Sequence, residues 1–347
     1  MEVKPRPRTT FVIRCVHNVQ THLNLLQKLK MKNEGKFEVK YKEKNYNIYE
    51  FLNNHPGGIN YVKPYEEKDV TKRMADHEHS KAAYYLLKEY KLGGRSTSQS
   101  EEDLECLVDW DKPMLSQVTN LGSKYKEWVI SPVDRQLRLF GNTILENLTI
   151  TPWYVVPIVW LPVIIYFITI GTDKYVQITK DPSPFASTVL CIGLGLLLWT
   201  LVEYSLHRWV FHMEPSGHSK IMIYLHFAIH GLHHKVPFDS RRLVFPPFPA
   251  AIISFILYKI ISLIFPESTR ILVWAGGMIG YVIYDMIHFY LHHGAPKENS
   301  YFYHLKRYHN QHHFAHHDNG FGISSMFWDN IFGTAISLRK LNLGIKW

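Results

Sequence analysis

Four long apolar stretches in the second half of the chain restrict its fold more than any other feature of the sequence. They cover residues 153–171, 185–202, 245–265 and 271–291. Each is close to the roughly 20 residues that a helix needs to cross the hydrocarbon core of a bilayer. Because a bilayer offers no water to backbone polar groups, the stretches predict an all-α membrane domain of about four transmembrane helices.

Charges beside the stretches predict which side of the membrane each loop occupies. The loop after the first stretch, with Asp173 and Lys174, and the loop after the third carry no net positive excess. The second loop and the tail carry the basic residues Lys220, Lys235, Arg241, Arg242, Lys306, Arg307, Arg339 and Lys340. The positive-inside rule predicts that these segments, and with four spans both termini, face the cytosol. Arg241 and Arg242 could also face lipid headgroups or an acidic end of a substrate.

Polar residues inside the last two stretches leave alternatives open. Lys259 interrupts the third stretch, and Asp285 and His288 lie in the fourth. A charge at the bilayer centre costs about 2.5–3.5 kcal/mol on insertion scales. Either Lys259 extends its amine to the interface, or the two stretches form a tilted or partly re-entrant hairpin.

Histidine is concentrated in the same half of the chain: 16 of the 21 histidines lie between His207 and His317. Ten recur at metal-ligand spacings, namely His207, His212, His230, His233, His234, His288, His292, His309, His312 and His313. Helix positions i, i+3 and i+4 share one face, so the HxxHH and HxxxH motifs present adjacent imidazoles. An offset of five, as in His207 and His212, does not share a helical face well, and we expect that pair where a helix leaves the membrane.

Imidazole nitrogen suits iron, zinc and copper, and ten such groups would provide about five ligands to each of two metal ions. The remaining histidines of this region are expected to lie outside the ligand set. They are His218, His226, His293, His304, His316 and His317.

Three carboxylates are candidates to accept the other imidazole N–H of the ligands, as acidic residues behind metal-bound histidines often do. Asp285 precedes His288 by three residues, and Asp239 and Glu203 are close to other histidine motifs. Helix-end charge or solvation of a loop is an equally good interpretation of each.

The N-terminal part reads as a small α+β module. Strands are expected at 11–13, 36–41 and 46–49, with a helix at 21–30. Residues 94–103 have the small, polar composition of a linker. We therefore predict three parts: a first domain over 1–95, a linker and juxtamembrane connector over 96–150, and the membrane domain over 151–347.

An HPGG motif at 55–58, followed by a second histidine at position 79, resembles cytochrome b5. The resemblance implies that His55 and His79 are the two axial ligands of haem b, with His77 as the main rival of His79. Two imidazoles fill both axial positions, which favours one-electron transfer over O2 binding. Gly57 and Gly58 would let the backbone turn closely at the haem edge.

The combination of HxxxxH, HGxHH, HxxxH and HxxHH motifs with an N-terminal HPGG module resembles the fatty acid 2-hydroxylase family. Further similar segments are 109–113, 234–239, 243–247, 321–322 and 327–329, so the resemblance covers about residues 11–334. It implies a multidomain protein: a small α+β cytochrome b5-like haem domain, then an all-α membrane domain of about four transmembrane helices with a cytosolic histidine-rich dimetal cap.

The resemblance also implies an activity, the 2-hydroxylation of long-chain fatty acids or of fatty acyl chains destined for sphingolipids and ceramides. O2 is the oxidant at two non-haem metal ions, iron being expected and zinc possible as prepared. Electrons arrive through the haem from a nicotinamide-dependent reductase of the cytochrome b5 or cytochrome P-450 type. The substrate could be a fatty acid, a fatty acyl thioester or a ceramide, and the implied location is the endoplasmic reticulum membrane, with both termini and the active site facing the cytosol.

Other function classes fit fewer of these features. A sterol or sphingoid-base hydroxylase or a desaturase would use the same metal chemistry. A non-catalytic haem electron carrier with a metal-binding anchor would not need ten histidines at these spacings. A structural or metal-storage membrane protein would show no dependence on haem. The net charge of +9 lacks the basic clusters with interleaved aromatic residues that bind nucleic acid.

Overall fold

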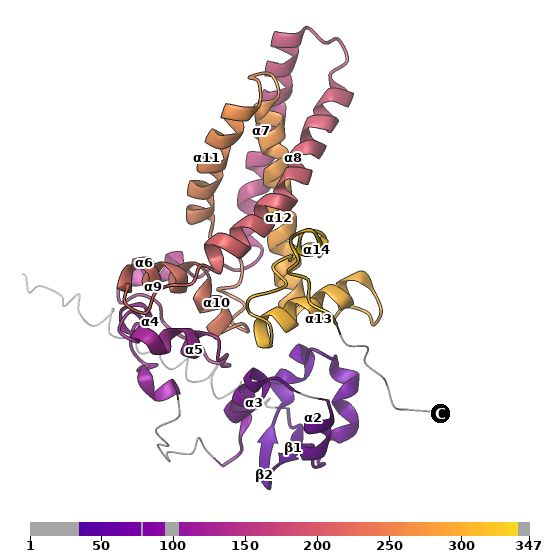
Figure 1. Cartoon of the computed structure of the whole chain (residues 1–347). Coiled ribbons are helices and arrows are strands. Elements are labelled where there is room, and N and C mark those ends of the chain that lie inside the picture. The colour runs from indigo at the N-terminus through magenta and orange to yellow at the C-terminus, as the bar shows by residue number, and fades with distance from the viewer. Residues whose placement is uncertain (1–34, 78, 94–103, 339–347) are drawn as a thin grey trace, which may run out of the picture.

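The computed structural model describes residues 35–77, 79–93 and 104–338. The strand predicted at 11–13, the helix predicted at 21–30 and the linker predicted at 94–103 lie outside the described residues. Within them the fold class is as predicted: a small N-terminal domain with two strands precedes a helical domain with four long apolar helices (Figure 1).

The N-terminal domain is built on one antiparallel hairpin. Val39 of the first strand lies opposite Tyr46 of the second, and alternate side chains of both strands enter a core with Phe37, Leu52 and Val62. The elements are β1 Glu38–Tyr41, β2 Lys44–Asn47, η1 Tyr49–Asn54, η2 Ile59–Tyr61, η3 Lys63–Tyr65, α2 Thr71–Asp76, α3 Lys81–Leu87 and η4 Lys88–Tyr90. Both strands lie close to their predicted positions.

The connector, described from Leu104 onward, is part of a larger core. Its elements are η5 Leu104–Leu107, α4 Met114–Val118, η6 Gly122–Lys124, α5 Tyr125–Val129 and α6 Thr143–Leu148. Met114 and Trp128 are fully buried and pack in one hydrophobic cluster with Ile223, Phe227 and Leu232. The connector thereby holds the segment that carries the HGxHH motif.

Four helices are long and apolar enough to cross a membrane: α7 Val155–Thr179, α8 Phe185–Ser205, α11 Pro247–Ile264 and α12 Arg270–His293. In α12, 61% of the most apolar window is buried, against 6% in α11, so α12 is the central helix of the bundle. A Cβ on Gly195 would lie 1.9 Å from the carbonyl oxygen of Val273, and one on Gly276 would lie 2.1 Å from that of Ile192. Small residues thus let α8 and α12 approach closely, as in other membrane helix pairs.

One detail of the bundle, the end of α7, differs from expectation. A second detail bears on the alternatives left open for Lys259 and the last two apolar stretches. Helix α7 continues to Thr179, so Asp173 and Lys174, which were expected in a loop, lie in its last turns, and Lys180 ends it with a φ of 58°. Helices α11 and α12 are each uninterrupted. Lys259 is exposed, with its amine 5.2 Å from the ring centroid of Phe255.

The last turns of α12 carry the HxxxH motif, His288 and His292, and the other histidine motifs are carried or bordered by shorter elements at the same end of the bundle. These are η7 Leu206–Phe211 and η8 Phe227–Gly231, both π-helical, and α9 Lys220–His226, α10 Leu232–Lys235, α13 Tyr301–Phe314 and α14 Phe327–Phe332. Figure 1 shows α13 between this end of the bundle and the N-terminal domain.

Candidate functional site

The ten predicted histidines come together as two groups of five, and within each group the ligand atoms lie within 4.8 Å of one another. The first group is His207, His212, His230, His234 and His312. The second group is His233, His288, His292, His309 and His313. The groups adjoin, since the rings of His234 and His313 stack with centroids 4.3 Å apart.

A π-helical turn explains the one spacing that did not suit an α-helix. At the end of α8 the N–H of His212 donates to the carbonyl of His207 at 3.0 Å, the i to i+5 bond of a π-turn. The wider turn brings an offset of five onto one face, so both rings enter the first group. We expected this pair to share a face poorly, and that expectation was wrong because the helix is π there. Single π-turns are frequent at functional sites.

Each HxxHH motif is divided between the two groups. His230 and His234 belong to the first group, whereas His233 belongs to the second. In α13 the division is reversed, because His309 and His313 join the second group. Positions i and i+4 stay together while i+3 points to the neighbouring group, so both motifs tie the two groups to each other.

The distances inside each group suit metal binding. In the first group the Nε2 of His230 is 3.1 Å from the Nε2 of both His207 and His212. In the second, the Nε2 of His309 is 2.8 Å from that of His292 and 3.1 Å from that of His313. A neutral imidazole has one N–H, so these contacts cannot all be hydrogen bonds. Two nitrogens that lie about 2.1 Å from one ion at right angles are themselves about 3 Å apart.

Burial keeps the imidazoles in the form that binds metal. The pKa values of His230, His233, His234 and His309 are held well below their usual range, first by burial and then by the neighbouring imidazoles. The Nε2 of His312 is buried with no hydrogen-bond partner among the described residues. Neutral, convergent rings with a free nitrogen fit metal ions of the kind that imidazole prefers.

Backbone carbonyls, not carboxylates, contact the outer nitrogens of two histidines of the first group. The Nδ1 of His207 is 2.6 Å from the carbonyl oxygen of Phe321, and the Nδ1 of His312 is 2.8 Å from that of Asn319. Asp329 holds this loop: its carboxylate accepts from the N–H groups of Phe321 and Gly322 at 2.9 and 2.8 Å. We did not predict a role for Asp329, which follows the histidine motifs in sequence and reaches them only through the fold.

The carboxylates chosen from sequence have other partners. Asp285 accepts from the N–H of Phe245 at 3.1 Å and from the hydroxyl of Tyr281 at 3.4 Å. Asp239 pairs with Arg242 at 3.5 Å. Glu203 accepts from the N–H and hydroxyl of Ser324. Among the described residues none of the three is hydrogen bonded to an imidazole of either group.

The other histidines of this half lie outside both groups, as expected. His218, His304 and His316 are exposed. His226 is buried, with its Nδ1 2.6 Å from the hydroxyl of Tyr125.

The N-terminal domain contains a second pair of facing imidazoles. The ring centroids of His55 and His79 are 6.3 Å apart across a cavity of about 300 Å³. Two imidazoles bound to opposite sides of one metal ion, each at about 2 Å, have centroids roughly 6 Å apart. The Nδ1 of His79 is 3.0 Å from the carbonyl oxygen of Met74, which leaves its Nε2 for a metal. Burial, and then the neighbouring His79, lower the pKa of His55 to about 4, so that ring is neutral.

The two glycines of the HPGG motif are required for different structural reasons. Gly58 has a φ of 89°, where other residues are strained. A Cβ on Gly57 would lie 3.1 Å from the ring of His55, so a residue with a side chain at this position would crowd that ring. His77, the rival ligand, is exposed but also lines the cavity. The cavity thus fits a flat group held between His55 and His79.

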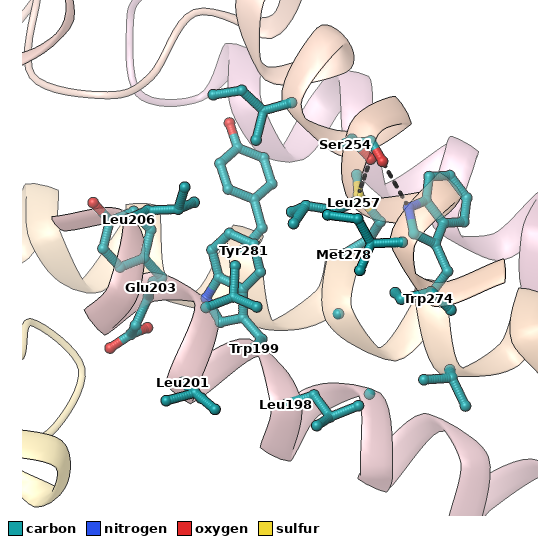
Figure 2. A pocket seen from close by; sticks show the side chains of 18 of the residues that line it. Leu198, Trp199, Leu201, Glu203, Leu206, Ser254, Leu257, Trp274, Met278 and Tyr281 are labelled. Atoms are coloured by element: carbon teal, nitrogen blue, oxygen red, sulfur yellow. Dashed lines mark hydrogen bonds between the residues drawn. The ribbon is translucent and has the colours of Figure 1, made fainter. Parts of the chain in front are cut away.

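An apolar cavity of about 270 Å³ lies between α8, α11 and α12 (Figure 2). Figure 2 shows Glu203 and Leu206 at one end and Trp274 at the other. At the end with Glu203, two lining residues stack on histidines of the two groups: Phe211 on His230 with centroids 5.3 Å apart, and Tyr284 on His288 with centroids 6.0 Å apart. The cavity therefore ends beside both histidine groups.

Comparisons with known proteins agree with the geometry. A family profile described as fatty acid hydroxylase matches residues 192–334, which include all ten histidines. A profile described as cytochrome b5-like heme/steroid binding domain matches residues 25–95, which include His55 and His79.

Full-length relatives share both parts. The chain is 39% identical over 330 residues to fatty acid 2-hydroxylase of Rattus norvegicus, covering 84% of this chain and 89% of the relative. It is 34% identical over 347 residues to ceramide very long chain fatty acid hydroxylase of Saccharomyces cerevisiae, covering 83% and 87%. A solved structure described as full-length scs7p, with only the hydroxylase domain visible, matches with a TM-score of 0.58 and 36% identity over 66% of this chain and 86% of that one. The chain therefore belongs to the fatty acid 2-hydroxylase family.

Proposed function

We propose that this protein hydroxylates C2 of long acyl chains that enter sphingolipids, at a dimetal site held by the two histidine groups. The observation that carries the proposal is the apolar cavity that ends beside both groups. Its lining follows most of α11, from Ala250 to Ile264. A helical segment of that length covers much of the hydrocarbon thickness of a bilayer. That shape suits one extended acyl chain.

The geometry described above supports the ligand assignments that we propose. We assign the two groups of five as ligands of two non-haem metal ions, with iron expected and zinc possible as prepared. His55 and His79 would hold haem b. When bound, the metal ions provide the O2-derived oxidant that breaks a C–H bond, and the haem provides electrons one at a time. Per turnover, one O2, two electrons and two protons give one C2 hydroxyl group and one water.

The chain's own residues position the substrate and exclude water. Phe211 and Tyr284 line the metal end of the cavity and support an imidazole of each group. Glu203 places a carboxylate at this end, and its Oε2 is buried with no hydrogen-bond partner among the described residues. An acyl chain that fills the cavity would therefore present the carbon near its polar end to the metal site.

The substrate class includes fatty acids, fatty acyl thioesters and ceramides. One relative, from Arabidopsis thaliana, is named dihydroceramide fatty acyl 2-hydroxylase, and the Saccharomyces cerevisiae relative is named as a ceramide hydroxylase. These names support an N-acyl chain as one substrate of this protein. Electrons would come from a nicotinamide-dependent reductase of the cytochrome b5 or cytochrome P-450 type.

We further propose that the protein lies in the endoplasmic reticulum membrane with both termini and the histidine groups in the cytosol, since the basic loops lie at the histidine end of the bundle. The division into parts at residues 95 and 150 stays a prediction. The core shared by Met114, Trp128 and Phe227 supports grouping the connector with the hydroxylase domain.

Expression in cells that lack fatty acid 2-hydroxylation tests the proposal. Sphingolipid acyl chains are quantified by mass spectrometry for the wild type, His233→Ala and His55→Ala. We expect 2-hydroxylated chains with the wild type, none with His233→Ala and little with His55→Ala. A folded, haem-loaded wild type that forms no 2-hydroxy product would contradict the proposal and favour a sterol hydroxylase or desaturase.

A further inference from the structure

Part of the wall of the cavity between His55 and His79 comes from the hydroxylase domain. Asn310, Gln311 and Phe314 of α13, with Ala315 just after it, line the same cavity as the two histidines of the N-terminal domain. Helix α13 also carries three ligands of the histidine groups. One helix therefore borders both candidate cofactor sites.

The two roles occupy opposite faces of α13. At about 100° per residue, His309, His312 and His313 point to one side of the helix, whereas Asn310, Gln311 and Phe314 point to the other. With side chains a helix is roughly 10–12 Å across. An electron that leaves the cavity toward the histidine groups therefore has about one helix to cross.

Contacts on both sides of this cavity hold the domains together. The hydroxyl of Tyr303 on α13 donates to the carbonyl of Gly57 at 3.3 Å, directly beside the HPGG turn. The side chain of Asn60 donates to Glu298 at 3.0 Å. Phe238, which follows the HGxHH motif, contacts Phe51 of the N-terminal domain with ring centroids 6.0 Å apart and stacks on Phe314 with centroids 6.1 Å apart.

A second set of contacts joins the N-terminal domain to the connector. Arg135 makes a two-pronged ion pair with Glu89, with both N to O distances at 2.7 Å and both side chains nearly buried. The hydroxyl of Tyr90 donates to Asp134 at 2.7 Å. Bidentate pairs of this kind are among the stronger and more specific polar contacts. They fix the orientation in which the cavity faces α13.

One polar group on the α13 wall is left for a ligand. Asn310 is 5% exposed, and its Nδ2 has no hydrogen-bond partner among the described residues. Leaving a buried amide without a partner is unfavourable, so such a group in a cavity wall indicates a ligand that accepts its hydrogen bond. The propionate oxygens of a haem group placed between His55 and His79 would meet that need.

We propose that α13 is a shared wall of the haem pocket and the metal site, and that Asn310 and Phe314 are positioning residues that contact the haem of the docked N-terminal domain. This inference rests on the proposed function. It adds that the domains work in one fixed arrangement, and that the haem pocket is complete only when the hydroxylase domain closes it.

Haem release from the purified full-length protein tests the shared wall without measuring product. Transfer of haem to excess apomyoglobin is followed by absorbance for the wild type, Asn310→Ala and Phe314→Ala. Phe302→Ala is the control, because Phe302 is an exposed aromatic residue of α13 that does not line the cavity. We expect release about tenfold faster in the two wall variants, the scale on which outer contacts change affinity. The control should match the wild type, and all variants should hold the same metal content.

Wild-type release rates in both wall variants would overturn the proposal, whether or not the protein makes 2-hydroxylated product. Rapid release together with a wild type that makes no product would instead overturn the proposed function alone.

Locking the arrangement provides the second measurement. Asn60 and Glu298 are both exposed and in contact, so Asn60→Cys with Glu298→Cys can be joined by a short bifunctional maleimide after Cys15, Cys106 and Cys191 are changed to serine. The haem is reduced without O2, then mixed with O2 and a ceramide, and its reoxidation is followed by absorbance. We expect the joined protein to reoxidise as fast as the unjoined one. A joined protein that keeps its haem and metals but stays reduced would overturn the docked arrangement as the working one.

Discussion

The two candidate cofactor sites are built in contrasting ways. His55 and His79 are close in sequence within one small domain, and both are only partly buried. The histidine groups collect their members from four segments between His207 and His313, and nine of the ten are buried. A local site depends on one motif and its fold, whereas a dispersed site depends on the packing of the whole bundle. We therefore expect that the His55–His79 site can be abolished without disturbing the histidine groups. We expect the histidine groups to tolerate few substitutions.

The largest expected effect is the loss of a central member of the proposed metal site. His309 lies within 3.1 Å of the Nε2 atoms of His288 and His313, and 2.8 Å from that of His292. We expect His309→Ala to remove product altogether and to lower metal content, with the haem absorbance unchanged. His304→Ala is the matched control, since His304 is an exposed histidine of the same helix. Metal analysis and absorbance of both purified variants check the prediction, and full metal content in His309→Ala would break the contrast between the sites.

The complementary change is in the local site. We expect His79→Ala to abolish the haem spectrum and most product while metal content stays at the wild-type level. His77→Ala should keep the spectrum, because His79, whose Nδ1 contacts the carbonyl of Met74, has its Nε2 free for haem iron. The absorbance of the oxidised and reduced proteins decides between the two. If His77→Ala lost the haem spectrum and His79→Ala kept it, His77 and not His79 would be the second haem ligand.

A smaller effect is expected from a residue that acts on the ligands through the backbone. Asp329 is fully buried and orders the loop whose Phe321 carbonyl contacts His207. Asp329→Asn keeps the shape but replaces an oxygen acceptor by an amide donor. We expect a loss of roughly 10–100-fold in activity or metal affinity, as for other outer partners of metal ligands. Metal titration checks this, with exposed Asp318→Asn as the control. Equal metal affinities in the two variants would show that Asp329 does not support the histidine groups.

The smallest expected effect on catalysis is a change of stability. Lys235 is completely buried and donates to Glu105 at 2.6 Å and to the carbonyl of Ser131 at 2.6 Å. Lys235→Met would remove the cationic partner of a buried carboxylate, which typically costs about 3–5 kcal/mol. Thermal unfolding should show a clear loss, while Lys112→Met, which breaks an exposed pair with Asp109, should change little. An unchanged Lys235→Met protein would mean that the connector does not stabilise the histidine segment.

The same contrast explains what could be predicted from sequence. Motifs of fixed spacing, such as the HPGG turn and the HxxHH pairs, predicted which histidines the fold brings together, because their geometry is local. The apolar stretches predicted the four helices because length and hydrophobicity alone decide membrane compatibility.

Features that depend on tertiary packing were not predictable. A π-turn looks like an α-helical segment in sequence, so the joint orientation of His207 and His212 was missed. Asp285 and Asp239 are near histidines in sequence, but their carboxylates meet Phe245 and Arg242 first. The wall that α13 gives to the haem cavity depends on how two domains dock, and no local pattern of residues records that contact.

The central claim is that the buried histidine groups catalyse an O2-dependent hydroxylation beside the apolar cavity. The most direct measurement is the mass of the product that the purified, metal-loaded protein forms from a ceramide under isotopically heavy O2, with a reductase and nicotinamide cofactor present. We predict a 2-hydroxylated acyl chain that carries the heavy isotope, and none with His233→Ala. A 2-hydroxyl group derived from water, or equal product from His233→Ala, would contradict it.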